Sequence, residues 1–170
     1  RVAVERSSGV ILTALALLRE QAPELELCVH LMLGLPGETD AQLVETAQRL
    51  NGAGVHAVKL HNLLVLANTP LARRYRAGQY TPLELPEYAR RVALFLEKLD
   101  PALCVHRLTA VVGNHEELIA PEWAKGRMAP HTFICAEMAR QGTWQGRLFE
   151  PAASPPPPLL DATAPQFMFA

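Results

Sequence analysis

Two strongly apolar segments, residues 27–33 and 55–66, carry histidine or lysine side chains between aliphatic ones. If both segments are β-strands, the side chain of His30 lies on the face of the first strand that is opposite to its leucines. Lys59 and His61 share one face of the second strand. A lysine and a histidine inside a buried strand are energetically costly unless they are paired or hydrated. We therefore predict a solvated cavity along this face, where the basic groups meet a ligand or water.

Two other interpretations of these residues remain open. His30 is about equally well explained as a core histidine whose ring nitrogens are hydrogen-bonded within the protein. Lys59 and His61 also fit an edge strand that has one face in water. The apolar residues on either side of Lys59 and His61 favour the cavity over the edge strand.

The first apolar segment ends in a short loop made of Gly34, Leu35, Pro36, Gly37 and Glu38. Glycine lets bare backbone approach a small molecule closely, and ligands of parallel α/β folds bind beyond the carboxyl ends of the strands. The N–H groups that begin the next helix could receive an anion or a polar group. The loop is a candidate ligand site, and a plain strand-to-helix turn is the alternative.

Helical and strand patterns alternate along the first part of the chain. A helix is expected at 9–20, before the first strand, and Thr39 with Gln42 forms a capping box that begins a second helix before the second strand. This order of helix, strand, helix, strand is typical of a parallel sheet covered by helices and joined by right-handed crossovers.

The pattern changes after the second strand. We expect a short helix at 71–77, a longer helix at 86–99, a third strand at 103–112 and a final helix at 131–140. Arg107 alternates with aliphatic residues on the third strand, which favours a structural ion pair. No internal repeat is present.

Cysteine usage and charge exclude several classes of protein. Cys28, Cys104 and Cys135 are too widely spaced for a disulfide framework or a paired-cysteine metal site, and we interpret them as buried small hydrophobes in a reducing cytoplasm. The chain has 17 acidic and 16 basic residues, a near-neutral balance that argues weakly against a dedicated polyanion binder. No apolar stretch approaches the ~20 residues of a membrane span. Because the chain begins at Arg1 without a signal-peptide pattern, we expect a piece of a longer cytoplasmic protein.

Several ordered motifs together resemble one enzyme superfamily. Residues 30–39 resemble the fifth-strand motif of radical S-adenosylmethionine (SAM) enzymes, with a loop one residue longer and with His30 and Met32 in place of glycine and isoleucine. Across residues 5–147 the chain is similar to a bacterial group of largely uncharacterised radical SAM proteins related to the catalytic subunit of elongator. The further motifs that carry this resemblance lie at 58–63, 68–72, 75–80, 87–88, 105–108, 120–123 and 145–146.

The resemblance implies an α/β fold in which residues 1–68 would be the last strands of a partial (β/α) radical SAM barrel and 69–149 a small α+β C-terminal extension. The proline-rich composition of residues 150–170 separately predicts a disordered tail. The first four strands, and with them the three-cysteine loop that holds a [4Fe–4S] cluster, are missing from this chain. None of its three cysteines can take that place, so the chain alone is expected to be inactive. Ala67, Asn68 and Thr69 stand where many relatives have Lys-Gly-Thr, which puts a contact by that lysine in doubt.

The resemblance also implies a reaction and its participants. In the intact protein, a reduced cluster would donate one electron to SAM, whose C–S bond breaks to give methionine and a 5′-deoxyadenosyl radical that abstracts hydrogen from the substrate. The cofactor-binding candidates are His30, Met32 and the five loop residues at 34–38, on the adenosine side. Lys59, His61 and Arg107 would face the substrate or the carboxylate of SAM.

Two alternatives to an enzyme remain. The chain could be a non-catalytic module that binds RNA or protein, by analogy with elongator and transfer RNA, or an inactive truncated remnant with exposed strand edges. The near-neutral charge argues that the basic residues form solvated helix faces instead. The candidate RNA-binding residues are Arg73, Arg74, Arg76, Arg90, Arg91, Lys125 and Arg127.

Overall fold

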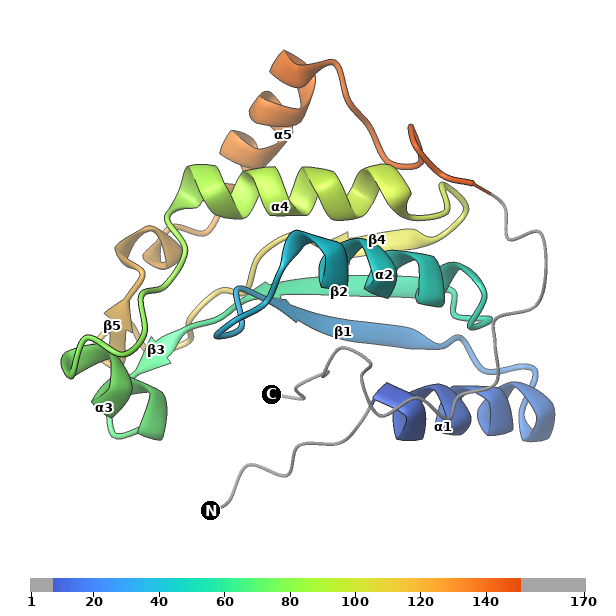
Figure 1. Cartoon of the computed structure of the whole chain (residues 1–170), viewed down its shortest axis with the longest axis horizontal. Helices are drawn as coiled ribbons and strands as arrows, with labels where there is room; N and C mark the ends of the chain where they lie inside the picture. Colours follow the sequence, from blue (N-terminus) through green and yellow to red (C-terminus); the bar gives the residue numbers. More distant parts are fainter. Residues whose placement is uncertain (1–7, 151–170) are drawn as a thin grey trace.

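The protein is built on a three-stranded parallel sheet with the strand order β1-β2-β4 (Figure 1). The computed structural model describes residues 8–150. The strands are β1 (Cys28–Leu33), β2 (Ala57–Asn62) and β4 (Cys104–Arg107), and β2 pairs in parallel with both of its neighbours. The predicted parallel pairing of the first two strands is confirmed, as is the α/β class.

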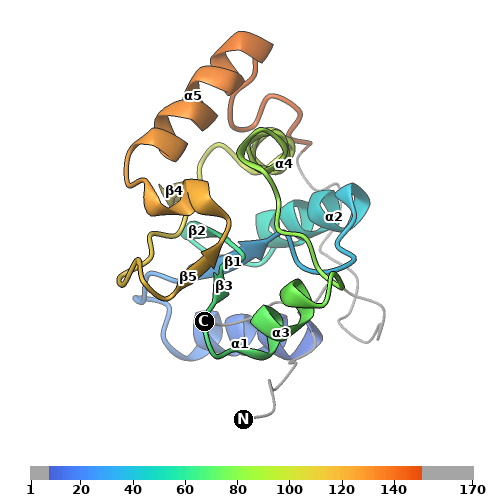
Figure 2. The same ribbon diagram turned by 90° about the vertical axis from the view of Figure 1, so that its left-hand side faces the viewer.

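Helices α2 (Asp40–Asn51) and α4 (Leu85–Lys98) cover one face of this sheet, and α1 (Ser8–Gln21) lies beside β1 (Figures 1 and 2). Alternate strand residues, among them Leu31 and Leu60, are buried against these helices. The opposite face carries the polar residues that the alternation predicts. The sheet therefore separates an apolar core from a polar face.

Local sequence signals explain where these helices begin and what they bury. In α2, the Thr39 hydroxyl accepts from the Gln42 N–H at 3.3 Å, and the Gln42 side chain accepts from the Thr39 N–H at 2.9 Å, so the predicted capping box is confirmed. Pro86 lies in the first turn of α4, where its missing N–H has no intrahelical role. The buried stripe of α4 includes the fully enclosed Tyr88 and Phe95.

A second, smaller sheet follows the first one. Strand β3 (Val65–Leu66) pairs antiparallel with β5 (Leu118–Ala120), next to helix α3 (Pro70–Arg76). The remaining elements are the 3₁₀ helix η1 (Glu122–Lys125) and α5 (Ala129–Gln141).

The single strands expected at 55–66 and 103–112 are each wrong in extent. The first divides into β2 and β3, and the second ends at Arg107. Just beyond Arg107, side-chain hydrogen bonds take the place of backbone hydrogen bonds between strands. The Asn62 side chain accepts from the Ala110 N–H at 2.9 Å, and the Tyr88 hydroxyl donates to the Leu108 carbonyl at 2.7 Å. With these backbone groups already bonded, the chain leaves the sheet.

The segment after α5 folds back onto α4. Gly142 ends α5 in the left-handed conformation, with φ of 63°. The Gly146 N–H then donates to the Leu96 carbonyl at 2.9 Å, and the Leu148 N–H donates to the Glu97 carbonyl at 2.8 Å. The last described residues are thereby attached to the core helix.

The interpretation of the cysteines as buried hydrophobes is wrong, because all three are exposed. Cys28 and Cys104 begin strands whose other face packs on the helices, so their side chains lie on the uncovered face. Cys135 lies on a solvent-facing part of α5. In the described residues, no helix has the length and apolar character of a membrane span. The predicted tail at 150–170 lies, beyond Glu150, outside the described residues.

Candidate functional site

The sheet face turned away from α2 and α4 gathers the basic residues predicted as site residues. In the strand register, His30 lies opposite Lys59, and Lys59 lies opposite Arg107. The rings of His30 and His61 stack with centroids 5.4 Å apart and an interplanar angle of 25°. The four side chains therefore form one cluster, contributed by all three strands, which we call the cationic face.

The structure excludes both alternative interpretations of the strand residues. His30 is exposed, so it is not a hydrogen-bonded core histidine. Lys59 and His61 belong to the central strand of the sheet and not to an edge strand. Both are half-buried, and Leu60, the single residue between them, faces the core.

Arg107 contacts His61 and not a carboxylate. Its Nη2 lies 2.5 Å from Nε2 of His61. Because a guanidinium can only donate, Nε2 must be the acceptor, and a neutral His61 ring carries its proton on Nδ1. Among the described residues, no ion pair of the kind expected for Arg107 is found, since no carboxylate reaches this face.

Burial and neighbouring cations keep both histidines neutral. Desolvation lowers the pKa of His61 to about 4, and the charges of Arg107, His30 and Lys59 act in the same direction. The pKa of His30 is also lowered, first by desolvation and then by Lys59 and Arg107. At neutral pH the permanent charges of the cationic face are those of Lys59 and Arg107.

The loop at 34–38 is held closed by side chains on both sides of Gly34. The Gly34 N–H donates to Oε2 of Glu38 at 2.8 Å, and the Gly34 carbonyl accepts from the Tyr80 hydroxyl at 3.1 Å. Gly34 has φ of 90°, and a Cβ at this position would lie 3.1 Å from Leu83. This position requires glycine for both its backbone angle and its close contact.

Glu38 is also tied to helix α4. Its Oε2 lies 3.3 Å from Nη1 of Arg91, and the two side chains are only 13% and 15% exposed. Burial raises the pKa of Glu38, against the opposing effects of the Gly34 N–H and Arg91. Sequence reasoning did not connect Tyr80, Leu83 and Arg91 with this loop because they lie 46 or more positions beyond the residues they contact, and no local pattern links them.

The tip of the loop is open, in contrast to Gly34. Gly37 has φ of 81°, and a Cβ there would meet no atom within 4 Å. Met32 and Leu35 pack against a small apolar cluster between the loop, α3 and the second sheet. This cluster consists of Leu63, Val65, Ala72, Tyr80 and Ala120. The loop therefore combines a fixed base with an accessible backbone tip.

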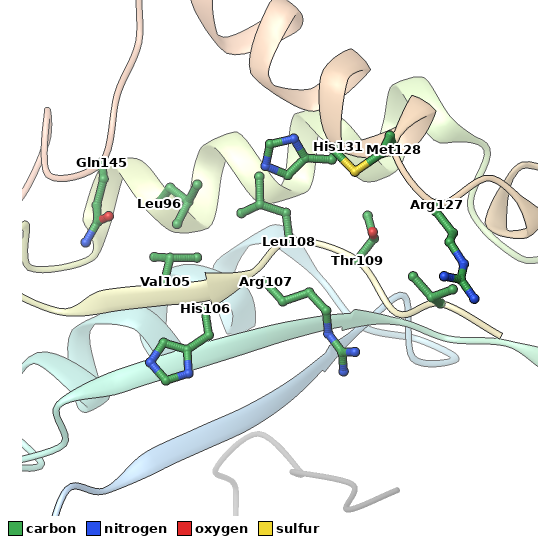
Figure 3. A pocket seen from close by; sticks show the side chains of 11 residues that line it. Leu96, Val105, His106, Arg107, Leu108, Thr109, Arg127, Met128, His131 and Gln145 are labelled. Carbon is green, nitrogen blue, oxygen red and sulfur yellow. The ribbon is translucent and has the colours of Figure 1, made fainter. Parts of the chain in front are cut away.

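A separate cavity of about 350 Å³ lies where β4 meets α4 and the start of α5 (Figure 3). Leu96, Leu108 and His131 line it from one side of β4, while the side chains of His106 and Arg107 point to the other side. The cavity and the cationic face thus meet at β4, and Arg107 borders both. No sequence signal pointed to the cavity.

No metal centre is found in the described residues. They contain no group of three histidine, cysteine, aspartate or glutamate side chains placed to hold a metal ion. The three cysteines are divided among β1, β4 and α5. The described residues thus do not fit the thiolate ligation of a [4Fe–4S] cluster.

The candidate RNA-binding residues divide into paired and unpaired groups. Arg90 bonds Asp40 at 2.8 Å and Glu87 at 2.8 Å, and Lys125 bonds Glu122 at 2.8 Å. Arg91 is bonded to Glu38 and Glu87. Within residues 8–150, salt bridges are absent for the other candidates, which are Arg73, Arg74, Arg76 and Arg127.

Residues 55–140 match the radical SAM C-terminal domain family. The chain belongs to this family. It is 34% identical over 125 residues to the uncharacterized protein MJ0486 of Methanocaldococcus jannaschii and 31% identical over 126 residues to the uncharacterized protein YtqA of Bacillus subtilis. Each match covers 74% of this chain but 39% of the relative. Protein YhcC of Escherichia coli is 32% identical over 103 residues, which are 61% of this chain and 33% of YhcC.

The fold is also similar to that of a solved structure, an archaeal Elp3 from Methanocaldococcus infernus with an N-terminal deletion. The TM-score is 0.63 at 16% sequence identity, and the match covers 79% of this chain and 31% of Elp3. At this identity the likeness establishes a shared fold. The resemblance to radical SAM proteins that the sequence indicates is thus confirmed. The chain spans about two-fifths of the length of MJ0486 and YtqA.

Proposed function

We propose that this chain is the C-terminal part of a radical SAM enzyme, whose parallel sheet continues a barrel begun by strands outside the chain. Residues 1–68 would complete that barrel, and residues 69–149 would form the extension packed against it. The family match and the relatives' greater length support this proposal. With a reduced [4Fe–4S] cluster, bound SAM supplies the 5′-deoxyadenosyl radical that abstracts hydrogen from a substrate.

The observation that carries this proposal is the stacking of His30 on His61 across two parallel strands that end beside the loop at 34–38. One sheet face and one strand edge thereby bring together basic side chains and an accessible glycine backbone. Ligands of parallel α/β proteins bind at this end of the strands.

The roles of the chain's own residues follow from their positions. The open backbone at Gly37, with Leu35 and Pro36, would line the adenosine side of SAM. Glu38 would hold the base of the loop in place through Gly34, because its carboxylate is buried beside Arg91 and turned away from the tip. His30 and Met32, on the neighbouring strand face, would border the same ligand.

The cationic face would meet the reacting molecules on the inner side of the sheet. Lys59, His61 and Arg107 would bind an anionic group and exclude bulk water from it. The cluster ligands would come from outside this chain, since its described residues do not fit them.

Substitution in YtqA tests the proposal. Alanine at the positions aligned with Lys59 and His61 should reduce SAM affinity or 5′-deoxyadenosine production at least about tenfold. Alanine at the position aligned with the exposed Arg140, which pairs with Glu137 on α5, serves as the control and should change neither quantity. Unchanged affinity and turnover in the first two variants would remove both residues from the site.

RNA binding is a second candidate, and the arginines of α3 favour it. Arg73, Arg74 and Arg76 form no salt bridge with any described carboxylate, unlike Arg90 and Arg91. Free cations on one short helix can contact phosphates. Replacing these three arginines by glutamine should lower transfer-RNA affinity and its salt dependence. Replacing Arg90 should leave both quantities unchanged.

A further inference from the structure

The cationic face carries two permanent positive charges that no described carboxylate balances. Lys59 and Arg107 lie directly opposite each other on β2 and β4. Like charges in this position destabilise a sheet. Neither residue takes part in any salt bridge within residues 8–150. Nothing within the described residues offsets this repulsion, and an anion between or above the two side chains would offset it.

The hydrogen bonds of Arg107 are also incomplete. Nη2 donates to His61, whereas the buried Nε has no partner among the described residues. Buried donors in proteins are nearly always satisfied. A donor left over beside two uncompensated charges is consistent with a ligand that brings oxygen acceptors.

We propose that the cationic face binds a phosphate group that belongs to the substrate and not the amino-acid end of SAM. Assigning the phosphate to a substrate rests on the proposed function. A phosphate presents up to two charges and three acceptor oxygens, which suits an arginine and a lysine side by side. His30 and His61, both neutral, add N–H groups without further charge.

The chemistry of SAM disfavours it as the occupant. SAM carries a sulfonium and an ammonium group beside its single carboxylate, so two of its three charges are repelled by Lys59 and Arg107. An amino-acid end requires acceptors for its ammonium, and the cationic face offers no carboxylate among the described residues. The sequence left the substrate and the carboxylate of SAM as alternatives, and the charge of this face separates them.

Phosphate binding must raise the pKa of His61, because a nearby negative charge favours the imidazolium form. The groups that face His61 are His30 from β1, Lys59 from its own strand, and Arg107 from β4. All are neutral or positive, so no described carboxylate competes with the ligand. The resonances of His61 therefore report on the site directly.

Inorganic phosphate added to the 170-residue chain provides the test, followed by calorimetry and by NMR of the histidine C–H groups. We expect phosphate to shift the His61 resonances, and Lys59→Gln or Arg107→Gln to weaken binding about tenfold or more. Arg140→Gln removes an exposed charge on α5, where Arg140 pairs with Glu137, and should leave affinity unchanged. A nucleoside monophosphate should bind at least about tenfold more tightly than its nucleoside, which separates the phosphate from the rest of the ligand.

Two results would overturn the proposal. Equal phosphate affinity in the chain and in the Lys59→Gln/Arg107→Gln double variant would place the binding elsewhere, and competitive displacement of phosphate by SAM would assign the face to the cofactor. If the glutamine variants do not fold, two other measurements test the proposal: the phosphate affinity of Arg107→Lys, and the shifts that phosphate causes in the His61 resonances of the unsubstituted chain. An absence of these shifts contradicts the proposal. If the cationic face binds phosphate but the complete protein cleaves no SAM, the proposed function is refuted and the phosphate site is not.

Discussion

The carboxylate of Glu38 accepts a hydrogen bond from the Gly34 N–H at 2.8 Å while Arg91 of α4 approaches the same oxygen to 3.3 Å. The strand-end loop is thereby connected to a helix 53 positions further along the chain. Tyr80 completes this arrangement from the other side of Gly34. Residues of α4 and of the segment before it thus help to determine the shape of a loop that follows β1.

Removing the Glu38 side chain should destabilise the protein more than removing an exposed acid. Glu38→Ala leaves the Gly34 N–H without its partner and removes one of the two carboxylates bonded to the largely buried Arg91, which keeps Glu87; this should cost about 1–3 kcal/mol of unfolding free energy. Glu38→Gln keeps an acceptor for Gly34 and should cost about half as much.

Urea denaturation measures this difference. Glu45→Ala is the control, because the Glu45 side chain is 43% exposed, pairs with Arg49 one turn away and should cost less than about 0.5 kcal/mol when removed. If Glu38→Ala is no more destabilising than Glu45→Ala, the loop does not depend on this carboxylate.

The hydroxyl of Tyr80 should contribute measurably to stability. Tyr80→Phe removes the hydrogen bond to the Gly34 carbonyl and leaves that acceptor unpaired, at a cost of about 1 kcal/mol. Tyr75→Phe is the matched control, since the Tyr75 hydroxyl makes no hydrogen bond within the described residues. Equal midpoints for the two variants in thermal unfolding would contradict this role of Tyr80.

Sequence reasoning predicted the elements and faces that depend on local periodicity. The alternation around His30 and His61 correctly put both rings on one sheet face, and the strand-helix order correctly predicted parallel pairing. The expected burial of Cys28 and Cys104, which came from the usual behaviour of free cysteines and not from alternation, is wrong, because both lie on the uncovered face.

Long-range partners could not be predicted in the same way. Nothing near Glu38 in the sequence indicates Arg91, and nothing near Arg107 indicates that it contacts His61, 46 positions earlier. The end of β4 is likewise set by Tyr88 and Asn62, which bond backbone groups just beyond the strand. These contacts arise from tertiary packing, and a local pattern carries no information about them.

The titration of His61 should depend on Arg107. The folded-state pKa of about 4 lies below the usual value of 6.5, so the unfolded chain binds this proton more readily. The contribution of His61 to stability is therefore fully present above pH 6.5 and is lost as pH falls toward 4.

NMR titration of the histidine C–H resonances checks this prediction. Arg107→Gln removes a neighbouring positive charge and should raise the pKa of His61 toward 6.5, whereas Arg74→Gln should not change it. A His61 pKa that is the same in all three proteins would show that Arg107 does not act on it.

Two glycines with similar backbone angles should respond differently to alanine. Gly146 has φ of 79°, and a Cβ there would lie 2.8 Å from Cδ of Pro101, whereas Gly78 has φ of 70° and open space around it. Gly78→Ala should cost about 1 kcal/mol from the backbone angle alone. Gly146→Ala should cost about 1–3 kcal/mol more, because the extra methyl group must displace Pro101 or detach the segment from α4. Equal losses in chemical denaturation would contradict the close packing of this segment.

The isolated chain should not assemble an iron–sulfur cluster. Its described residues offer no suitable ligand group, and its three cysteines lie on separate elements. Anaerobic reconstitution followed by iron and sulfide analysis measures this directly. A stoichiometric cluster on the 170-residue chain would mean that the ligand assignment is wrong.

The production of 5′-deoxyadenosine by a chimera tests the central claim most directly. Residues 8–150 of this chain would replace the aligned segment of YtqA, and the purified chimera would be reconstituted and reduced with SAM under anaerobic conditions. We predict that it forms 5′-deoxyadenosine at a rate within about tenfold of intact YtqA. A folded, cluster-bearing chimera that forms none while intact YtqA does would contradict the assignment of this chain to the barrel of a radical SAM enzyme.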